Sequence, residues 1–298
     1  MKPLLALDWG TSSLRGALLA PDGAVLDERA LPRGILTVAA GDFRAVFDAS
    51  FGDWMAQSRL CLISGMAGSQ QGWLEAPYCA CPAGFADIAA RLAWIEPGRI
   101  AIVPGLSTLS DGVPDVMRGE ETQVFGALQL LGLGEARLVL PGTHSKWVRV
   151  EGGRITGFST WMTGEFYALL RQHSILSRML PAAEPPLDAQ AFGQGVAQAL
   201  KGAGLLHTAF STRTLALFKQ LPPDALPSYL SGLVIGEELK SQSLQRGDSV
   251  VVMGAQALTA RYEQALAQQG VTVRAVGNHA TWTGLQAMAG TLAAASSA

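Results

Sequence analysis

The stretch LALDWGTSSLRGALL, residues 5–19, places an acid, a glycine and three hydroxyl side chains between two apolar runs. Apolar runs on either side of a polar bend predict two buried strands joined by a turn. Gly10 leaves the backbone N–H groups of such a turn uncovered, and the hydroxyls of Thr11, Ser12 and Ser13 can turn toward the same point. The bend therefore predicts an anion-binding loop as well as a connection between strands.

The pattern recurs in the second half of the chain, where GTHS at 142–145 repeats the GTSS at 10–13. Strands are expected on both sides of each copy. The order of apolar runs predicts the elements βββαβαβ in the first half, and this order restarts after a helix expected at 122–131. The repeated order favours an internal duplication over chance. We therefore expect an α/β protein with two βββαβαβ-type domains, at 1–118 and 119–298.

Two such loops facing each other across a cleft between the domains could hold the β- and γ-phosphates of one nucleotide. Asp8 would repel phosphate at the first loop unless a divalent cation lies between them. The sequence therefore predicts Mg²⁺ at Asp8, bound directly or through water. The chain has no Walker loop and no Gly-x-Gly-x-x-Gly dinucleotide motif, and it also lacks the signature motifs of zinc proteases and serine hydrolases.

The composition suits a compact globular protein, since 49% of the 298 residues are hydrophobic and 15% are charged. The net charge of -2 indicates no electrostatic attraction to nucleic acid or anionic membranes, so we expect neither as a partner. The apolar run before Asp8 is too short for the core of a signal peptide. The three cysteines do not suggest a disulfide framework, and we expect a cytoplasmic protein.

Three short motifs resemble those of the actin/hexokinase/Hsp70 ATPase fold, whose domains are ribonuclease H-like. DWGTSSLR at 8–15 and the loop at 141–145 resemble its two phosphate motifs, and VMGA at 252–255 resembles its adenosine motif. More narrowly, three longer segments resemble the 2-dehydro-3-deoxygalactonokinases. These segments are GMAGSQQGWLEAPYCACPAG at 65–84, VPDVMRGEETQVFGAL at 113–128 and LPGTHSKWV at 140–148.

The resemblance implies an enzyme that phosphorylates 2-dehydro-3-deoxy-D-galactonate to its 6-phosphate in galactonate and galactose catabolism, with ATP and Mg²⁺. It implies that the N-terminal domain binds substrate and the first phosphate group, and that the C-terminal domain binds nucleotide. Asp8 would hold Mg²⁺, and Glu121 would take the proton from the acceptor hydroxyl, although Glu120 beside it is an alternative. The nucleotide would be held by Gly10, Thr11, Ser12, Ser13, Gly142, Thr143, His144, Gly254 and Ala255.

The acceptor is a carboxylate, so its site should contain a positive group. Arg15 and Arg118 are the candidates, although Arg15 could instead neutralise phosphate or hold Asp8, and Arg118 could be a surface residue. The loop at 68–73 should follow the carboxyl end of a strand, where α/β folds usually bind ligands. We therefore expect Ser69 and Trp73 to contact substrate, with packing under the Pro77 turn as the alternative for Trp73.

Two other functions stay open at this point. The chain could be a kinase for another sugar or sugar acid of the same fold, including the gluconate epimer, or it could be an ATPase or phosphohydrolase without kinase activity. The expected partners are a small sugar acid and ATP, with a homodimer left open.

Overall fold

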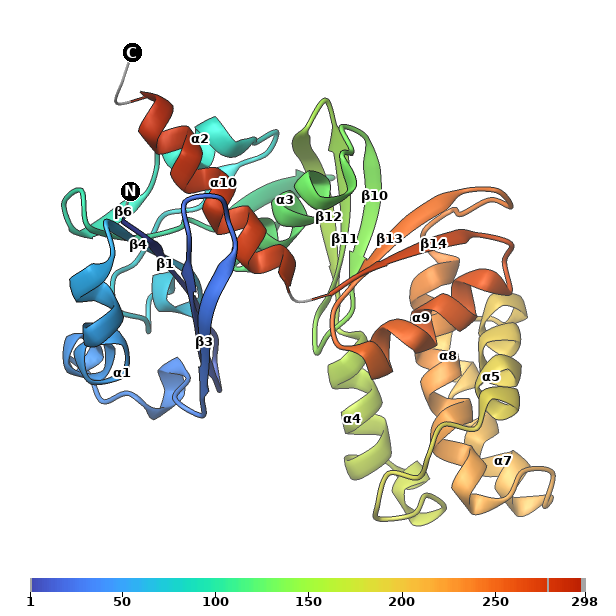
Figure 1. The fold of residues 1–298 in the computed structure, drawn as a ribbon. Helices are drawn as coiled ribbons and strands as arrows, with labels where there is room; N and C mark the ends of the chain where they lie inside the picture. The colour runs from blue at the N-terminus through green and yellow to red at the C-terminus, as the bar shows by residue number, and fades with distance from the viewer. Residues whose placement is uncertain (1, 278, 296–298) are drawn as a thin grey trace. The chain divides into compact units, whose positions relative to one another are not determined.

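The computed structural model describes residues 2–277 and 279–295, and the chain folds into two compact units (Figure 1). Unit 1 takes in residues 1–136, 148–159 and 276–298, whereas unit 2 takes in residues 137–147 and 160–275. The chain therefore enters unit 2 twice and returns to unit 1 each time.

The main sheet of unit 1 contains six strands. They are β1 (Leu4–Trp9), β2 (Leu14–Leu19), β3 (Val25–Leu31), β4 (Leu60–Gly65), β6 (Ala93–Glu96) and β7 (Ile100–Ile102). Their order across the sheet is β3-β2-β1-β4-β7-β6. The first three strands form an antiparallel meander, and β1 pairs in parallel with β4, which pairs in parallel with β7.

One face of this sheet packs against helix α1 (Phe43–Gln57). Side chains alternate along a strand, so Leu5, Leu7 and Trp9 of β1 all point to the α1 side, where they join a buried apolar cluster. Asp8 lies between them in the sequence and points to the opposite face. The strand thus anchors its apolar side chains in the core and leaves the acid at its carboxyl end outside that cluster.

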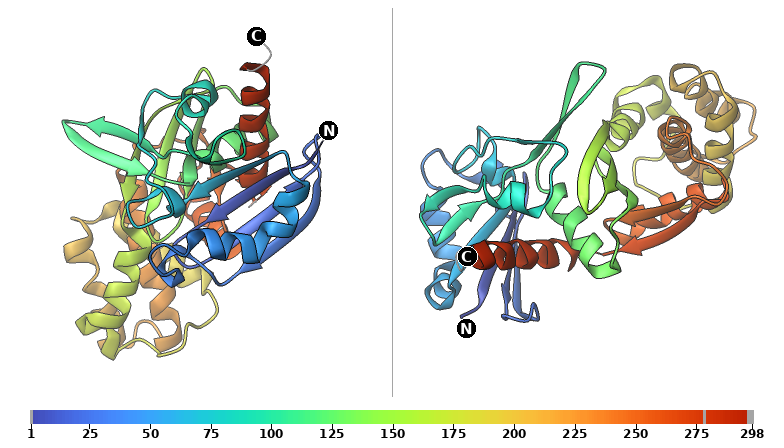
Figure 2. Two further views of the ribbon diagram at one scale, coloured as in Figure 1. Left: turned by 90° about the vertical axis from the view of Figure 1, so that its left-hand side faces the viewer. Right: turned by 90° about the horizontal axis from the view of Figure 1, so that it is seen from above.

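The opposite face is covered by helix α10 (His279–Ala295), which contacts β1, β2 and β4. Helix α3 (Glu120–Leu131) lies beside α10 in unit 1 (Figure 2). A Cβ on Gly126 would come within 1.7 Å of the Ala280 carbonyl oxygen, and one on Gly284 within 2.1 Å of the Thr122 oxygen. The two helices therefore meet backbone to backbone. For this reason the compact units differ from the expected domains 1–118 and 119–298, which place both helices in the second domain.

A second sheet has five strands. They are β10 (Ala136–Leu140), β11 (Ser145–Glu151), β12 (Arg154–Trp161), β13 (Ser249–Met253) and β14 (Thr272–Val276). Their order, β12-β11-β10-β13-β14, is that of β3-β2-β1-β4-β7 in the first sheet. This shared order agrees with the duplicated βββαβαβ pattern expected from the sequence.

Between the third and fourth strands of the second sheet, where the βββαβαβ pattern has one helix, the chain forms several helices. They are α4 (Thr163–His173), α5 (Ala189–Lys201), α6 (Leu205–Thr208), α7 (Ser211–Leu217) and α8 (Leu226–Lys240), and α9 (Gln256–Ala267) follows β13. Helices α5 and α8 approach closely, because a Cβ on Gly195 would come within 2.1 Å of the Tyr229 carbonyl oxygen and one on Gly232 within 2.1 Å of the Phe192 oxygen.

Unit 1 also contains elements that the repeating pattern does not include. They are β5 (Cys79–Ala80), β8 (Leu106–Ser110) and β9 (Val113–Met117), whereas helix α2 (Phe85–Ala89) is the second helix of the pattern. The three strands form a small sheet in the order β5-β8-β9, and β9 leads directly to α3. Among the described residues, none of the helices is long and apolar enough to cross a bilayer.

Candidate functional site

The first glycine-hydroxyl loop, residues 10–13, connects β1 to β2. Backbone hydrogen bonds within the loop and with Ile35 fix its position. The N–H of Gly10 donates to the Ser13 carbonyl at 2.9 Å, and the N–H of Ile35 donates to the Gly10 carbonyl at 3.0 Å. The side chains of Thr11, Ser12 and Ser13 are exposed. The loop therefore has a fixed base and offers three hydroxyls to solvent, as an anion-binding loop requires.

Asp8 and Arg15 form an ion pair across the hairpin. Their Cα atoms are in register, and Nη2 of Arg15 donates to Oδ2 of Asp8. The other oxygen, Oδ1, lies 3.2 Å from where a Cβ on Gly65 would stand, and Gly65 has a φ of 94°. Glycine therefore keeps the space beside Oδ1 open.

A magnesium ion fits this donor set, because Mg²⁺ in nucleotide sites is held by one or two carboxylates together with phosphate oxygens. Within the described residues there is no cluster of three or more His, Cys, Asp or Glu side chains able to enclose a metal by itself. The Oδ1 oxygen of Asp8, beside the space that Gly65 leaves open, therefore suits an ion that also binds the phosphates of a nucleotide.

Glu121 lies in the first turn of α3 and is completely buried. The N–H of Gly119 donates to its Oε2 at 2.7 Å, and the Thr122 hydroxyl donates to its Oε1 at 3.2 Å. The Thr122 hydroxyl is also 2.9 Å from the hydroxyl of Ser64, which is the β4 residue in register with Asp8. Two hydrogen-bonded side chains, Thr122 and Ser64, thus connect Glu121 to β4, the strand beside Asp8.

Burial raises the pKa of Glu121 to about 8, with a further contribution from the negative charge of Glu120. A carboxyl group with a pKa near neutral pH suits proton transfer. Glu120 is only partly buried, and its Oε2 accepts from the N–H of Arg118 at 3.0 Å. The two acids therefore differ in environment, although they are neighbours in the sequence.

Arg118 is partly buried, so the alternative prediction that it lies on the surface does not hold. Its Nη2 donates to the Ala76 carbonyl at 2.8 Å, and its guanidinium lies 4.4 Å above the ring of Tyr78. Its Nε and Nη1 atoms are buried and have no hydrogen-bond partner among the described residues. A Cβ on Gly68 would come within 2.7 Å of Nη1, so the guanidinium packs directly against the loop at 68–73.

Ser69 and Trp73 belong to the same segment but have different surroundings. The Ser69 hydroxyl donates to the Met66 carbonyl at 2.8 Å. Trp73 packs at the edge of the core, with its ring centroid 6.0 Å from that of Trp9 and 5.4 Å from that of Phe47. Trp73 therefore packs against these two rings, and its contact with substrate stays a prediction.

The second loop, between β10 and β11, is supported by the first turn of α4. The N–H of Glu165 donates to the Thr143 carbonyl at 3.1 Å, and Nε2 of His144 lies 2.6 Å from Oε2 of Glu165. A Cβ on Gly164 would come within 2.5 Å of the Gly142 carbonyl oxygen, so glycine is required for this approach. The imidazole of His144 thus points toward the Glu165 carboxylate. The backbone of Gly142 and Thr143 packs against the first turn of α4.

A cavity of about 240 Å³ lies beside the second loop within unit 2. Gly142 and Thr143 form one wall, and α4, α8 and α9 supply the others. Val234, Ile235 and Leu258 give an apolar surface, and the Ser231 hydroxyl accepts from Nη1 of Arg261 at 3.1 Å. These α8 and α9 residues were not predicted, because no sequence motif distinguishes them from ordinary helix residues.

The predicted adenosine motif lies near this loop. Strand β13 pairs in parallel with β10, so the carboxyl ends of both strands lie at the same edge of the sheet. Gly254 has a φ of 145°, and a Cβ there would stand 3.6 Å from the Pro141 carbonyl oxygen. Ala255 then precedes α9, whose Leu258 lines the cavity.

Comparison with known proteins gives long and consistent matches. A family model described as 2-keto-3-deoxy-galactonokinase matches residues 8–288. The chain is 40% identical over 292 residues to the probable 2-dehydro-3-deoxygalactonokinase DgoK1 of Rhizobium meliloti, with 95% of each chain covered. It is 35% identical over 288 residues to the 2-dehydro-3-deoxygalactonokinase of Escherichia coli, with 96% of this chain and 97% of the relative covered.

Solved structures agree with the sequence matches. A crystal structure from Sinorhizobium meliloti, described as a "putative 2-dehydro-3-deoxygalactonokinase protein", has a TM-score of 0.89 at 39% identity and covers 96% of this chain and 98% of its own. The activator of 2-hydroxyisocaproyl-CoA dehydratase from Clostridium difficile, with bound ADPNP, has a TM-score of 0.52 at 11% identity and covers 99% of this chain and 98% of its own. The fold is therefore the actin/hexokinase-type ATPase fold expected from the motifs.

Proposed function

The chain belongs to the 2-keto-3-deoxy-galactonokinase family, and from this membership we propose that it transfers the γ-phosphoryl group of ATP to the 6-hydroxyl of 2-dehydro-3-deoxy-D-galactonate. The enzyme is a sugar-acid kinase of galactonate catabolism. The observation that best supports the chemistry is the repeated Gly-Thr-x-Ser loop, because it follows the first strand of each of two sheets with the same strand order.

The two loops have complementary roles in this proposal. Backbone N–H groups and hydroxyls of Gly10, Thr11, Ser12 and Ser13 hold phosphate in unit 1. Gly142, Thr143 and His144 do so in unit 2, and the adenosine lies against Gly254 and Ala255 and enters the 240 Å³ cavity. Asp8 would hold Mg²⁺, and the ion would supply positive charge beside the phosphate oxygens.

Glu121 acts as the general base. Its carboxylate accepts the proton of the acceptor hydroxyl as the hydroxyl oxygen forms a bond to the γ-phosphorus, and the bond to the leaving oxygen of ADP breaks. The raised pKa supports this role, because a base with a pKa near the working pH holds the proton strongly enough to take it. Glu120 remains the alternative base.

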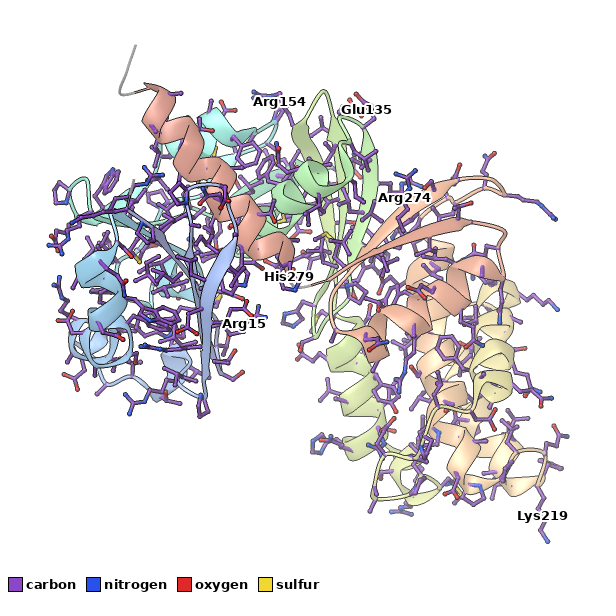
Figure 3. The ribbon with its side chains drawn as sticks, in the orientation of Figure 1. Arg15, Glu135, Arg154, Lys219, Arg274 and His279 are labelled. Atoms are coloured by element: carbon purple, nitrogen blue, oxygen red, sulfur yellow. The ribbon has the colours of Figure 1, made fainter. Side chains whose placement is uncertain are left out.

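The acceptor carboxylate is recognised by positive charge. Arg118 and Arg15 supply that charge, and Ser69 and Trp73 contribute further contacts. Arg15, labelled in Figure 3, is already paired with Asp8, whereas Arg118 has two guanidinium nitrogens without an acceptor in the described part of the chain. An amide derivative of the sugar acid should therefore bind more weakly than the acid itself, since it lacks the charge.

An ADP-release assay tests the proposed reaction. The purified chain is given Mg²⁺ and ATP with 2-dehydro-3-deoxygalactonate, with the gluconate epimer and with neutral hexoses in turn. We expect release that depends on the galactonate derivative. Release from neutral hexoses alone would indicate another sugar kinase, and release that is independent of any acceptor would indicate an ATPase or phosphohydrolase.

Three expectations about context are part of the proposal. The small-molecule partners are the sugar acid and ATP, without nucleic acid or membrane. The protein works in the cytoplasm, where this catabolic step has access to ATP. A homodimer is the oligomeric state to be checked by light scattering.

A further inference from the structure

A buried carboxylate in unit 2 has no role in the reaction described above. Glu238 of α8 is only 2% exposed. Its Oε1 accepts from the indole Nε1 of Trp147 at 2.6 Å, and its Oε2 accepts from the Tyr262 hydroxyl at 2.8 Å and from the Thr163 hydroxyl. The three donors come from β11, α9 and α4, so one side chain joins four elements.

The same network reaches the second phosphate loop. The Tyr262 hydroxyl is 2.9 Å from the hydroxyl of Ser145, which is completely buried and ends the loop sequence GTHS. Its counterpart Ser13, at the end of GTSS, is exposed. The repeated motif is therefore used differently in the two units, since its last hydroxyl faces solvent in unit 1 and is bonded inside the network in unit 2.

The network also forms part of the cavity wall. Thr163 and Tyr262 both line the 240 Å³ cavity, together with Gly142 and Thr143 of the loop. A change at Glu238 would therefore alter two wall residues and, through Ser145, the end of the loop. The acid itself does not line this cavity.

Burial of an acid is costly, and apolar side chains could fill the same space without this cost. Burial raises the pKa of Glu238, while the hydrogen bonds from its donors act in the opposite direction. Buried polar networks that are fully bonded hold their elements in one arrangement. At the edge of a ligand cavity, that rigidity can lower the cost of ordering the site on binding.

We propose that Glu238 is a positioning residue for the nucleotide, which holds Thr163, Tyr262 and Ser145 so that the second phosphate loop and the cavity wall keep their binding geometry. This inference rests on the proposed function, because it takes the nucleotide to bind in the cavity beside Gly142 and Thr143. The hydrogen bonds of Glu238, Tyr262 and Ser145 connect the core to the site, and the loop motif alone does not indicate them.

Two tyrosines provide a matched test. Tyr262→Phe removes the hydroxyl that joins Glu238 to Ser145 and keeps the ring. Tyr229→Phe is the control, because Tyr229 is likewise buried, at 4% exposed against 1% for Tyr262, and its hydroxyl is likewise bonded to a serine, Ser211, at 2.7 Å. Tyr229 and Ser211 do not line the cavity.

The measurements are the dissociation constant of a non-hydrolysable ATP analogue by calorimetry, the KM values of ATP and of the sugar acid, and the Tm. We expect Tyr262→Phe to weaken analogue binding by about fivefold to tenfold, with an unchanged KM for the sugar acid. Tyr229→Phe should stay within about twofold of the wild type, although its Tm falls comparably. Equal weakening by both variants, or an unchanged affinity in Tyr262→Phe, would overturn the inference.

A second pair of variants covers the case in which Tyr262→Phe does not fold. In Glu238→Gln the amide oxygen can accept from Trp147, and the amide N–H groups can donate to the hydroxyls of Thr163 and Tyr262, so we expect near wild-type affinity. In Glu238→Ala the affinity for the ATP analogue should fall by at least the factor expected for Tyr262→Phe. Equal affinities in the Gln and Ala variants would count against positioning. Failure of the wild type to bind the analogue would instead remove the proposed function itself.

Discussion

Asp8 and Arg15 face each other across β1 and β2, and the guanidinium donates to Oδ2 of the carboxylate. The pairing leaves Oδ1 on the side of Gly65, where a side chain would come within 3.2 Å. The hairpin thus combines an oriented acid, a fixed positive charge and an open space at the edge of the first phosphate loop.

Substitution of Asp8 tests the magnesium site. Asp8→Ala should lower turnover of Mg·ATP by about 10-fold to 100-fold or more and raise the Mg²⁺ concentration needed for half-maximal rate, because a carboxylate ligand is lost. The control is Asp53→Ala, which breaks the Arg29–Asp53 pair on the surface of the same unit. A Mg²⁺ titration of both variants is the measurement, and an unchanged titration for Asp8→Ala would exclude Asp8 as a metal ligand.

The general base can be assigned by comparing two neighbouring acids. Glu121→Gln should lower kcat by about 10²-fold to 10⁴-fold with little change in the KM of ATP, because proton transfer is lost while nucleotide binding is kept. Glu120→Gln should retain most of the activity. Steady-state kinetics of both variants decide between them, and the reverse pattern would assign the role to Glu120.

The buried position of Glu121 predicts an activity that rises with pH. The carboxyl must be ionised to accept a proton, and its pKa is raised to about 8, so kcat/KM should increase from pH 6 through pH 8 and level off about one pH unit above the pKa. If the measured kcat/KM stays constant between pH 6 and pH 8, Glu121 is not the general base.

The same group should also make stability depend on pH. Its pKa rises from 4.5 in the unfolded chain to about 8 in the folded chain, so the folded state keeps a proton that the unfolded state releases. The stability contributed by this proton is complete below the unfolded pKa and is lost as the pH rises through the folded pKa. Denaturant unfolding at pH 5 and pH 9 should show a larger loss in the wild type than in Glu121→Gln.

Gly164 provides a steric test of the second loop. An added methyl group would come within 2.5 Å of the Gly142 carbonyl oxygen and 2.9 Å of the Thr143 Cα, so Gly164→Ala must displace the loop. We expect a severalfold rise in the KM of ATP without a similar rise for the sugar acid. Gly290→Ala on α10 is the control, since a Cβ there meets no atom of the described part of the chain within 4 Å.

Several features of the fold and the site were predictable because they depend on local patterns. Two glycine-hydroxyl stretches between apolar runs predicted two hairpins, and both occur, between β1 and β2 and between β10 and β11. Trp73 was harder to interpret, because an aromatic residue after a strand can face a ligand or the core. Its contacts with Trp9 and Phe47 come from segments far away in the sequence.

The amino-acid sequence by itself determined the family, the two repeated loops and the acid at the edge of the first loop, since these reside in contiguous motifs whose spacing is visible. Only the tertiary structure decided that Ser145 is buried while Ser13 is exposed, that Arg118 lies against the loop at 68–73, and that Glu238 joins four elements beside the cavity. The reason is physical. Hydrogen bonds between distant elements depend on how helices pack on a sheet, and that packing leaves no periodic or local signal at the residues that it brings together.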